Sequence, residues 1–221
     1  MGRISQILID SFLPLLKAGL TFTVPLALIS FSIGIVLALM VALIRVFGKG
    51  PLVFIVKFYV WIIRGTPLLV QLFIIFYGLP SLGVTLNAFI SAVIGFTLSV
   101  GAYNSETIRG AILSVPKGQW EAANALGMSK SQAMLSVILP QTIKVAIPSL
   151  SNSFISLVKD TSLAATITVA ELFQVAQQVT ARTYEPLWLY IEVAFIYLMF
   201  CSVLTYLQAK MEGWYSRHLS I

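Results

Sequence analysis

The sequence predicts an all-α, polytopic membrane protein with about five transmembrane helices. Of its 221 residues, 58% are hydrophobic and only 10% are charged, whereas soluble domains carry about 25% charged residues. Several apolar runs are long enough to cross a bilayer, and the basic residues gather between alternate runs. We therefore interpret residues 1–221 as a single transmembrane domain, whose apolar runs are interrupted by one half-polar segment at about 115–140.

Five apolar runs are candidates for membrane spans. The first, residues 18–44, contains no charged residue, and at about 1.5 Å rise per residue it is long enough to cross with some tilt. The second, residues 52–79, is interrupted by Arg64 and the sequence RGTP, so we expect a bent or discontinuous span. The third begins with residues 88–102 and becomes polar at YNSETIRG (103–110), and the remaining two are expected at about 145–158 and 187–207.

The basic residues are distributed unevenly between the two sides that five spans define. One side carries Arg45, Lys49, Lys57, Arg109, Lys117, Lys130, Lys144, Lys210 and Arg217, and the other carries Arg3, Lys17, Lys159 and Arg182. Because basic residues accumulate in cytoplasmic loops, this bias predicts an N-terminus outside, with the half-polar segment and the C-terminus in the cytoplasm. The net charge of +6 is then explained by these loops, and no nucleic-acid partner is expected.

Sequence signatures of catalysis and of metal binding are not found. The chain has one cysteine and one histidine, so clusters of these metal ligands are not expected. A phosphate-binding glycine loop, the zinc motif H-E-x-x-H and the nucleophile motif G-x-S-x-G do not occur. We therefore expect no catalytic residue, no metal site and no cofactor in this chain, and an enzyme is the least favoured class of function.

The half-polar segment contains the signals of two short helices joined by a turn. A first helix is expected at about 119–126, and Gly127 suits its C-terminus. Ser129 and Gln132 have the spacing of a capping box, which starts a second helix, and Pro140 is expected to disturb that helix. Periodicity leaves two interpretations open: an amphipathic helix lying on the inner leaflet, or a docking surface for a soluble partner.

The same segment resembles the signature of the membrane subunits of ATP-binding-cassette importers. The triplet Glu121, Ala122 and Ala123 ends four residues before Gly127, and the triplet Ile-Leu-Pro at 138–140 follows that glycine. Four further stretches, in chain order, are similar to the polar amino acid uptake branch of this family. They are RGTPLLVQLF (64–73), YNSETIRGAI (103–112), KGQWEAA (117–123) and NSFISLVKDTSLA (152–164).

The resemblance implies that the half-polar segment is a coupling helix-turn-helix that sits in a groove of a cytoplasmic ATPase. Its coupling residues would be Glu121, Ala122, Ala123, Gly127, Leu139 and Pro140. The implied partners are two ATP-binding subunits, which bind the ATP and Mg, a second permease subunit, an extracytoplasmic solute-binding protein and membrane lipid. We expect a homodimer of permease subunits in a bacterial plasma membrane, and the sequence leaves a heterodimer open.

The resemblance also implies that the cargo is an L-amino acid. Residues 154–173 are most similar to cystine permeases of the family, so cystine is favoured, with arginine, glutamine, glutamate and histidine left open. The alternative function is an ion-gradient-driven secondary transporter or channel. That class is expected to show acidic residues paired within spans and an inverted repeat, and neither is seen in the sequence.

Ionisable and short polar residues within the spans are candidates for the substrate path. Asp160, Thr161 and Ser162 are expected to line the path and to meet a substrate ammonium group. The other interpretation is a local ion pair between Asp160 and Lys159. Arg64 also has two interpretations, because it can attract a substrate carboxylate or satisfy backbone carbonyls that the RGTP break leaves open.

A second group of path candidates lies in the sequence YNSETIRG. Glu106 and Arg109 are three residues apart on one helix face, so they are expected either to pair or to form an inner gate. Asn104 and Ser105 lie near the same depth as candidates for the path. Hydrogen bonding between packed helices is the other interpretation of these two residues.

Overall fold

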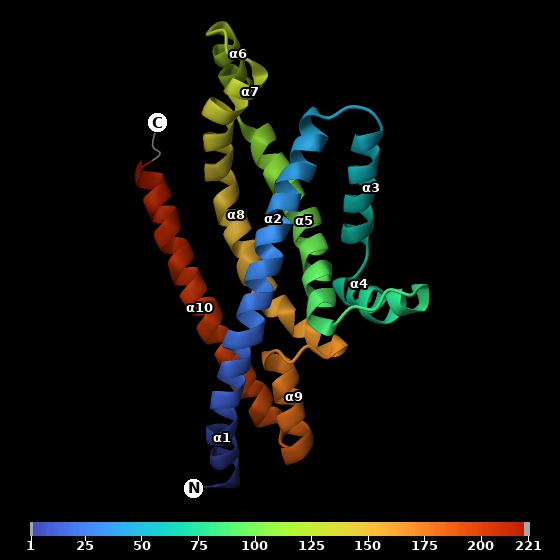
Figure 1. Cartoon of the computed structure of the whole chain (residues 1–221). Helices are drawn as coiled ribbons and strands as arrows, with labels where there is room; N and C mark the ends of the chain where they lie inside the picture. The colour runs from blue at the N-terminus through green and yellow to red at the C-terminus, as the bar shows by residue number, and fades with distance from the viewer. Residues whose placement is uncertain (1, 219–221) are drawn as a thin grey trace.

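The computed structural model describes residues 2–218, with side chains described through Gly213. These residues form helices and turns and contain no strand. Four continuous helical segments are long and apolar enough to cross a membrane, and one sharply bent pair of helices makes a fifth. Figure 1 shows the continuous segments running along an elongated molecule, with the bent pair at one side of it. The prediction of an all-α membrane fold with about five spans is confirmed.

The first span is longer than the predicted run at 18–44. The helix α1 (Arg3–Ala18), the π-turn η1 (Gly19–Thr23) and the helix α2 (Val24–Phe47) form one continuous helical segment of 45 residues. The charged residues of α1 lie on its exposed side, and Leu15 on the opposite side is completely buried. The predicted boundary was wrong because α1 is amphipathic, and its charges interrupt the apolar run without ending the helix.

The second span is bent, which confirms the prediction from the RGTP sequence. It comprises α3 (Pro51–Gly65), α4 (Leu68–Phe73), the π-turn η2 (Ile74–Gly78) and the 3₁₀ turn η3 (Leu79–Leu82). The part before the break and the part after it meet at 106°. The side chain of Gln71 donates hydrogen bonds to the carbonyls of Ile63 at 2.8 Å and Thr66 at 3.1 Å. Gln71, and not Arg64, therefore satisfies the carbonyls that the break leaves open.

The third span, α5 (Ala88–Ser114), packs most extensively against α2. The side chain of Asn87 caps its first turn by accepting a hydrogen bond from the backbone N–H of Ile90 at 2.8 Å. The two helices come close at Gly34, where an added Cβ would lie 2.5 Å from Cγ1 of Val100. The helix continues from the apolar part at 88–102 through the polar residues that follow, and one of these, Glu106, contacts Arg45 of α2 and Arg64 of α3.

Replacing Gly34 by alanine is expected to destabilise the protein, because the new methyl group would collide with Val100. Overpacking of this kind typically costs about 1–3 kcal/mol. The matched control is Gly110→Ala in α5, where an added Cβ would meet no atom within 4 Å, and alanine there favours the helix. Thermal unfolding in detergent should show a lower midpoint for Gly34→Ala alone. Equal midpoints for both variants would contradict the close approach.

The fourth span is continuously helical from Lys130 to Ile167 and is longer than the predicted run at 145–158. Its parts are α7 (Lys130–Ala133), the π-turn η4 (Met134–Ile138), α8 (Leu139–Asp160) and the 3₁₀ turn η5 (Thr161–Ile167). The expectation that Pro140 disturbs this helix is confirmed, since the α-helical pattern gives way to the π-turn at 134–138, but the helix does not end there. Proline lacks an N–H group and clashes with the preceding turn of an α-helix, but the wider π-turn ends two residues earlier and makes room for it. The π-turns η1 and η2 precede Pro25 and Pro80 in the same way.

The last two helices are α9 (Leu172–Thr183) and α10 (Pro186–His218), so the mixed connection between spans four and five contains a helix of its own. The buried carboxylate of Glu171 stands at the start of α9. It accepts hydrogen bonds from the hydroxyl groups of Tyr197 at 3.0 Å and Thr23 at 3.5 Å. These contacts join α9 to α10 and to the π-turn of the first span.

The two ends of the molecule carry different elements (Figure 1). The short helices α6 (Lys117–Ala125) and α7 lie at one end, on the same side as the turn between α2 and α3 and the C-terminal part of α10. The start of α1 and α9 lie at the opposite end. An odd number of spans places the start of α1 and the end of α10 at opposite ends of the molecule in this way.

Candidate functional site: a helical elbow and a charge cluster

A helical elbow (residues 117–138) follows the third span and is formed by α6 together with α7 and η4, which are the first part of the fourth span. Gly127 ends α6 in the left-handed conformation, with φ of 74°. The N–H of Met128 reaches the carbonyl of Ala123 at 3.1 Å, and the N–H of Gly127 reaches that of Asn124 at 2.9 Å. This is the Schellman pattern, in which glycine is the favoured residue at the turn. The predicted helix stop at Gly127 is confirmed.

The second helix of the elbow starts at the predicted capping box. The backbone N–H of Gln132 donates to the hydroxyl of Ser129 at 3.3 Å, and the backbone N–H of Ser129 donates to the side chain of Gln132 at 2.9 Å. Two helix signals, one stopping α6 and one starting α7, therefore meet within three residues and fix the angle of the elbow.

One face of the elbow is packed against the spans. Ala123 is buried, and Trp120 packs against the apolar cluster formed by α2, the end of α5 and Ile138 of η4. The ring of Trp120 lies 6.1 Å from that of Phe47 at the end of α2. Leu139 and Pro140 are half-buried in the first turn of α8. Of the predicted coupling residues, Ala123, Leu139 and Pro140 thus belong mainly to the joint between the elbow and the spans.

The opposite face of the elbow is open. Glu121, Ala122 and Gly127 are exposed, and Leu126 is 79% exposed at the tip. A leucine so exposed at the end of the molecule, beside small residues, gives a surface onto which another protein can pack closely. The elbow therefore has an outer face able to receive a contact and an inner face able to pass its movement to α5 and α8.

The second feature is the Glu106 cluster, which consists of Arg45, Arg64, Glu106 and Arg109. Oε2 of Glu106 lies 2.9 Å from Nε of Arg109, so the predicted pair is present. Oε1 of the same carboxylate lies 2.5 Å from Nη1 of Arg45 and 3.3 Å from Nη1 of Arg64. The guanidinium group of Arg64 also stands 5.4 Å above the ring of Tyr103. The cluster joins α2, α3 and α5 with charged contacts.

Arg45 is the member of this cluster that the sequence did not indicate. It closes the first apolar run, where its position is typical of a loop residue, and it lies 61 positions away from Glu106. Only the close packing of α2 on α5 brings the two together. The charged residues in and near RGTP and YNSETIRG indicate ion pairs between the spans, but they do not identify which residues pair with Glu106.

The neighbours of Glu106 in the chain are buried. Ser105 donates its hydroxyl hydrogen to the carbonyl of Ala102 at 2.7 Å, which is a contact within the helix. Asn104 is 2% exposed, and its Nδ2 has no hydrogen-bond partner among the described residues. The structure therefore brings Arg64 and Glu106 together and places Asn104 and Ser105 in the packed interior of the same helix.

Asp160, Thr161 and Ser162 lie apart from the Glu106 cluster, where α8 passes into η5. Asp160 and Lys159 are both exposed, and the two side chains do not form an ion pair. Thr161 is buried and donates to the carbonyl of Val158 at 2.8 Å. Ser162 lines a cavity of about 590 Å³ together with Tyr197. Asp160 is thus an exposed carboxylate with no ion pair within 4 Å among the described residues, although the charge of the adjacent Lys159 acts on it.

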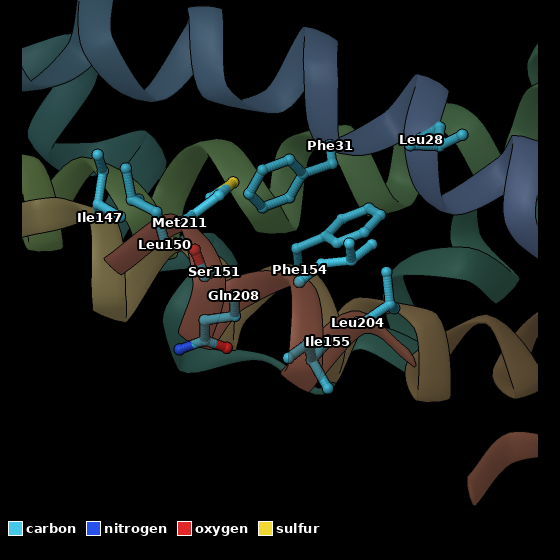
Figure 2. A pocket seen from close by; sticks show the side chains of 11 residues that line it. Leu28, Phe31, Ile147, Leu150, Ser151, Phe154, Ile155, Leu204, Gln208 and Met211 are labelled. Atoms are coloured by element: carbon cyan, nitrogen blue, oxygen red, sulfur yellow. The ribbon is translucent and has the colours of Figure 1, made fainter. Parts of the chain in front are cut away.

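Another cavity, of about 340 Å³, lies between α2, α8 and α10 (Figure 2). Phe31 and Phe154 meet edge to face in it, with ring centroids 5.0 Å apart. Its walls are almost entirely apolar, and the amide of Gln208 is directed to Asn152 and Glu212. This cavity offers no charged group that could hold an amino acid. Nor do the described residues contain a group of three or more His, Cys, Asp or Glu side chains that could hold a metal ion.

Comparison with known proteins identifies the family of the chain. Residues 34–217 match the model of a family described as the binding-protein-dependent transport system inner membrane component. The chain belongs to this family. It is therefore a multi-pass inner membrane component of a transporter, which favours the importer interpretation over an ion-gradient-driven transporter or channel.

Relatives and solved structures agree with this membership. The L-cystine transport system permease protein TcyB of Bacillus subtilis (strain 168) is 53% identical over 96% of this chain and 91% of that protein. The probable amino-acid ABC transporter permease protein YckA of the same organism is 40% identical over 97% of this chain and 95% of that protein. A crystal structure of an amino acid ABC transporter with histidines has a TM-score of 0.87 and 35% identity, covering 93% of this chain and 96% of that chain.

Proposed function

We propose that this family member is the transmembrane subunit of an ATP-driven importer of an L-amino acid, with L-cystine as the favoured cargo. The observation that carries this proposal is the 53% identity to a cystine permease over nearly the whole chain. The pattern of residues 154–173, which resembles cystine permeases, points in the same direction. ATP and Mg would be bound by a partner subunit, which supplies the energy.

The elbow is proposed to transmit that energy. Its exposed face, with Ala122, Leu126 and Glu121 at the rim, would lie in a groove of the ATPase. Its inner face is fixed to the ends of the spans through Ala123 and Trp120. Closure of two ATPases on ATP would therefore move the attached spans as rigid bodies and switch the path between outward-facing and inward-facing states.

The proposed assembly contains two permease subunits, two ATP-binding subunits and an extracytoplasmic solute-binding protein. A homodimer of this chain is the simplest form of the permease pair. The elbow and the C-terminus would face the cytoplasm, and the N-terminus would lie outside. The bias of the basic residues supports this orientation, because the elbow lies at the end of the molecule that carries most of the loop lysines and arginines.

The substrate path is proposed to include both groups of polar residues within the spans. Asp160 would meet the ammonium group of the cargo, since its carboxylate is exposed and has no ion pair within the described chain. Thr161 and Ser162 would support the adjoining wall. The second group, Arg64 and Glu106 with Asn104 and Ser105 behind them, would form a charged part of the path nearer to the elbow.

Uptake into proteoliposomes tests the proposed function. The permease would be reconstituted with candidate ATP-binding and solute-binding subunits and supplied with labelled L-cystine and a panel of other L-amino acids. We expect uptake that requires ATP and is unchanged when sodium and proton gradients are collapsed. Uptake driven by either gradient without the ATPase would overturn the proposal in favour of a secondary transporter.

A further inference from the structure

The Glu106 cluster contains more positive than negative charge. Three guanidinium groups, those of Arg45, Arg64 and Arg109, surround the single carboxylate of Glu106, which leaves two positive charges uncompensated. In addition, the Nε of Arg45 is buried and has no hydrogen-bond partner among the described residues. Uncompensated charge within membrane spans is costly. The cluster is therefore incomplete by itself and favours a further anion.

Arg64 is the arginine best placed to bind that anion. Its side chain is 43% exposed, whereas that of Arg45 is 14% exposed and held behind the carboxylate. Its contact with Glu106, at 3.3 Å, is the longest of the three. The exposed ring of Tyr103 supports the flat face of the guanidinium group, which leaves its N–H edge open. Such an edge matches a carboxylate, because two parallel N–H groups can donate to its two oxygens.

The charged surroundings of Arg64 disfavour a lipid-facing position. Arg109, 34% exposed, flanks it on α5, so the exposed surface between α3 and α5 carries two cations. Ionisable side chains at membrane depth face the bundle interior or a water-filled cavity. This surface therefore faces water or another subunit, and in the transporter proposed above it borders the path of the cargo.

We propose that Arg64, flanked by Arg109 and Tyr103, binds the α-carboxylate of the transported amino acid, so that the permease has a carboxylate subsite of its own. The incoming carboxylate takes Arg64 away from Glu106, while Arg45 and Arg109 keep their contacts with it. This inference rests on the proposed function, because the amino acid cargo is part of that function.

Direct binding to the permease–ATPase complex tests the subsite. The complex is placed in nanodiscs without the solute-binding protein and titrated with labelled L-cystine. Unlabelled cystine should displace the label, and cystamine, which lacks both carboxylates, should not. Arg64→Gln should weaken cystine binding about tenfold or more, since a hydrogen bond to a charged group is commonly worth that factor. Arg64→Lys should recover part of the affinity, because it restores the charge without the planar edge.

Two controls distinguish a carboxylate bound at Arg64 from a general effect of charge and from a bound lipid phosphate. Lys57→Gln removes an exposed cation from the same helix and should leave binding unchanged. Nanodiscs with and without phosphatidylglycerol test whether a lipid phosphate fills the site. Displacement of cystine by cystamine, or unchanged cystine binding in Arg64→Gln with weaker retention of phosphatidylglycerol, would overturn the proposal. If Arg64→Gln does not fold, Tyr103→Leu takes its place, and unchanged cystine affinity there counts against the subsite.

The uptake assay with the wild-type complex distinguishes failure of the carboxylate subsite from failure of the importer function. If ATP-driven cystine uptake is present but the complex without its binding protein does not bind cystine, the carboxylate subsite is rejected and the importer function stands. If ATP drives no uptake, the proposed function itself is rejected.

Discussion

Replacing Gly127 by proline is expected to abolish ATP-driven uptake while leaving the chain inserted in the membrane. Gly127 adopts φ of 74°, whereas proline is held near about −65°. Proline also removes the N–H that reaches the carbonyl of Asn124 at 2.9 Å. The angle between α6 and α7 would change, and the outer face of the elbow would no longer match the ATPase. Uptake and ATP hydrolysis, measured together, should show hydrolysis without transport.

Two further variants separate loss of docking from general damage to the elbow. Gly118→Ala is the matched control. Gly118 lies in α6, the helix that Gly127 ends, and an added Cβ at Gly118 meets no atom within 4 Å. This variant should transport normally. Glu121→Lys changes only the charge of an exposed side chain and should also uncouple hydrolysis from uptake. Normal uptake in both Gly127→Pro and Glu121→Lys would count against a coupling role for the elbow.

The variant Glu106→Gln is expected to be strongly destabilised. It removes the only carboxylate to which Arg45, Arg64 and Arg109 are paired among the described residues and leaves three neighbouring cations to repel one another. The Glu106 side chain is partly buried, at 22% exposed, so the loss should be smaller than the about 3–5 kcal/mol that is typical when one partner of a fully buried pair is removed. Size-exclusion chromatography after heating in detergent should show a clearly lower aggregation temperature and a smaller yield than for the wild type.

Two further variants at acidic residues provide the comparison for Glu106→Gln. Glu106→Asp keeps the negative charge and should retain part of the lost stability. Glu185→Gln removes a carboxylate whose ion pair with Arg3, at 3.8 Å, involves a side chain that is 71% exposed. Surface pairs contribute little, so this variant should behave like the wild type. If Glu106→Gln is as stable as Glu185→Gln, the cluster does not hold α2, α3 and α5 together.

Features set by neighbouring residues were predictable from the sequence. The break at RGTP follows from a glycine and a proline within four residues, because the residue before proline avoids the helical conformation. The stop at Gly127 and the capping box at Ser129 and Gln132 follow from equally local rules. These local signals define the elbow, and the sequence of this elbow carries part of the resemblance to importer subunits.

Features set by packing were not predictable in the same way. The local rule for Pro140 indicates a disturbed helix, but one wider turn beforehand lets the fourth span continue. The charged residues of α1 placed it outside the first apolar run of the sequence. Its buried side nevertheless packs against α9 and α10, and the hydroxyl of Ser11 donates a hydrogen bond to the carboxylate of Glu192 in α10 at 2.6 Å. The partners of Glu106 come from three helices, and sequence spacing identified only Arg109, which lies on the same helix.

The side of the membrane on which the elbow lies is the most direct test of the central claim. In a Cys201→Ala background, Ala122→Cys marks the elbow, and Tyr184→Cys marks the opposite end, where the native side chain is 84% exposed. A membrane-impermeant maleimide applied to intact cells should label the variant at 184 and not the variant at 122. In inside-out vesicles the variant at 122 should react, and added ATPase subunit should protect it. Labelling of the variant at 122 in intact cells, or no protection by the ATPase, would contradict the account.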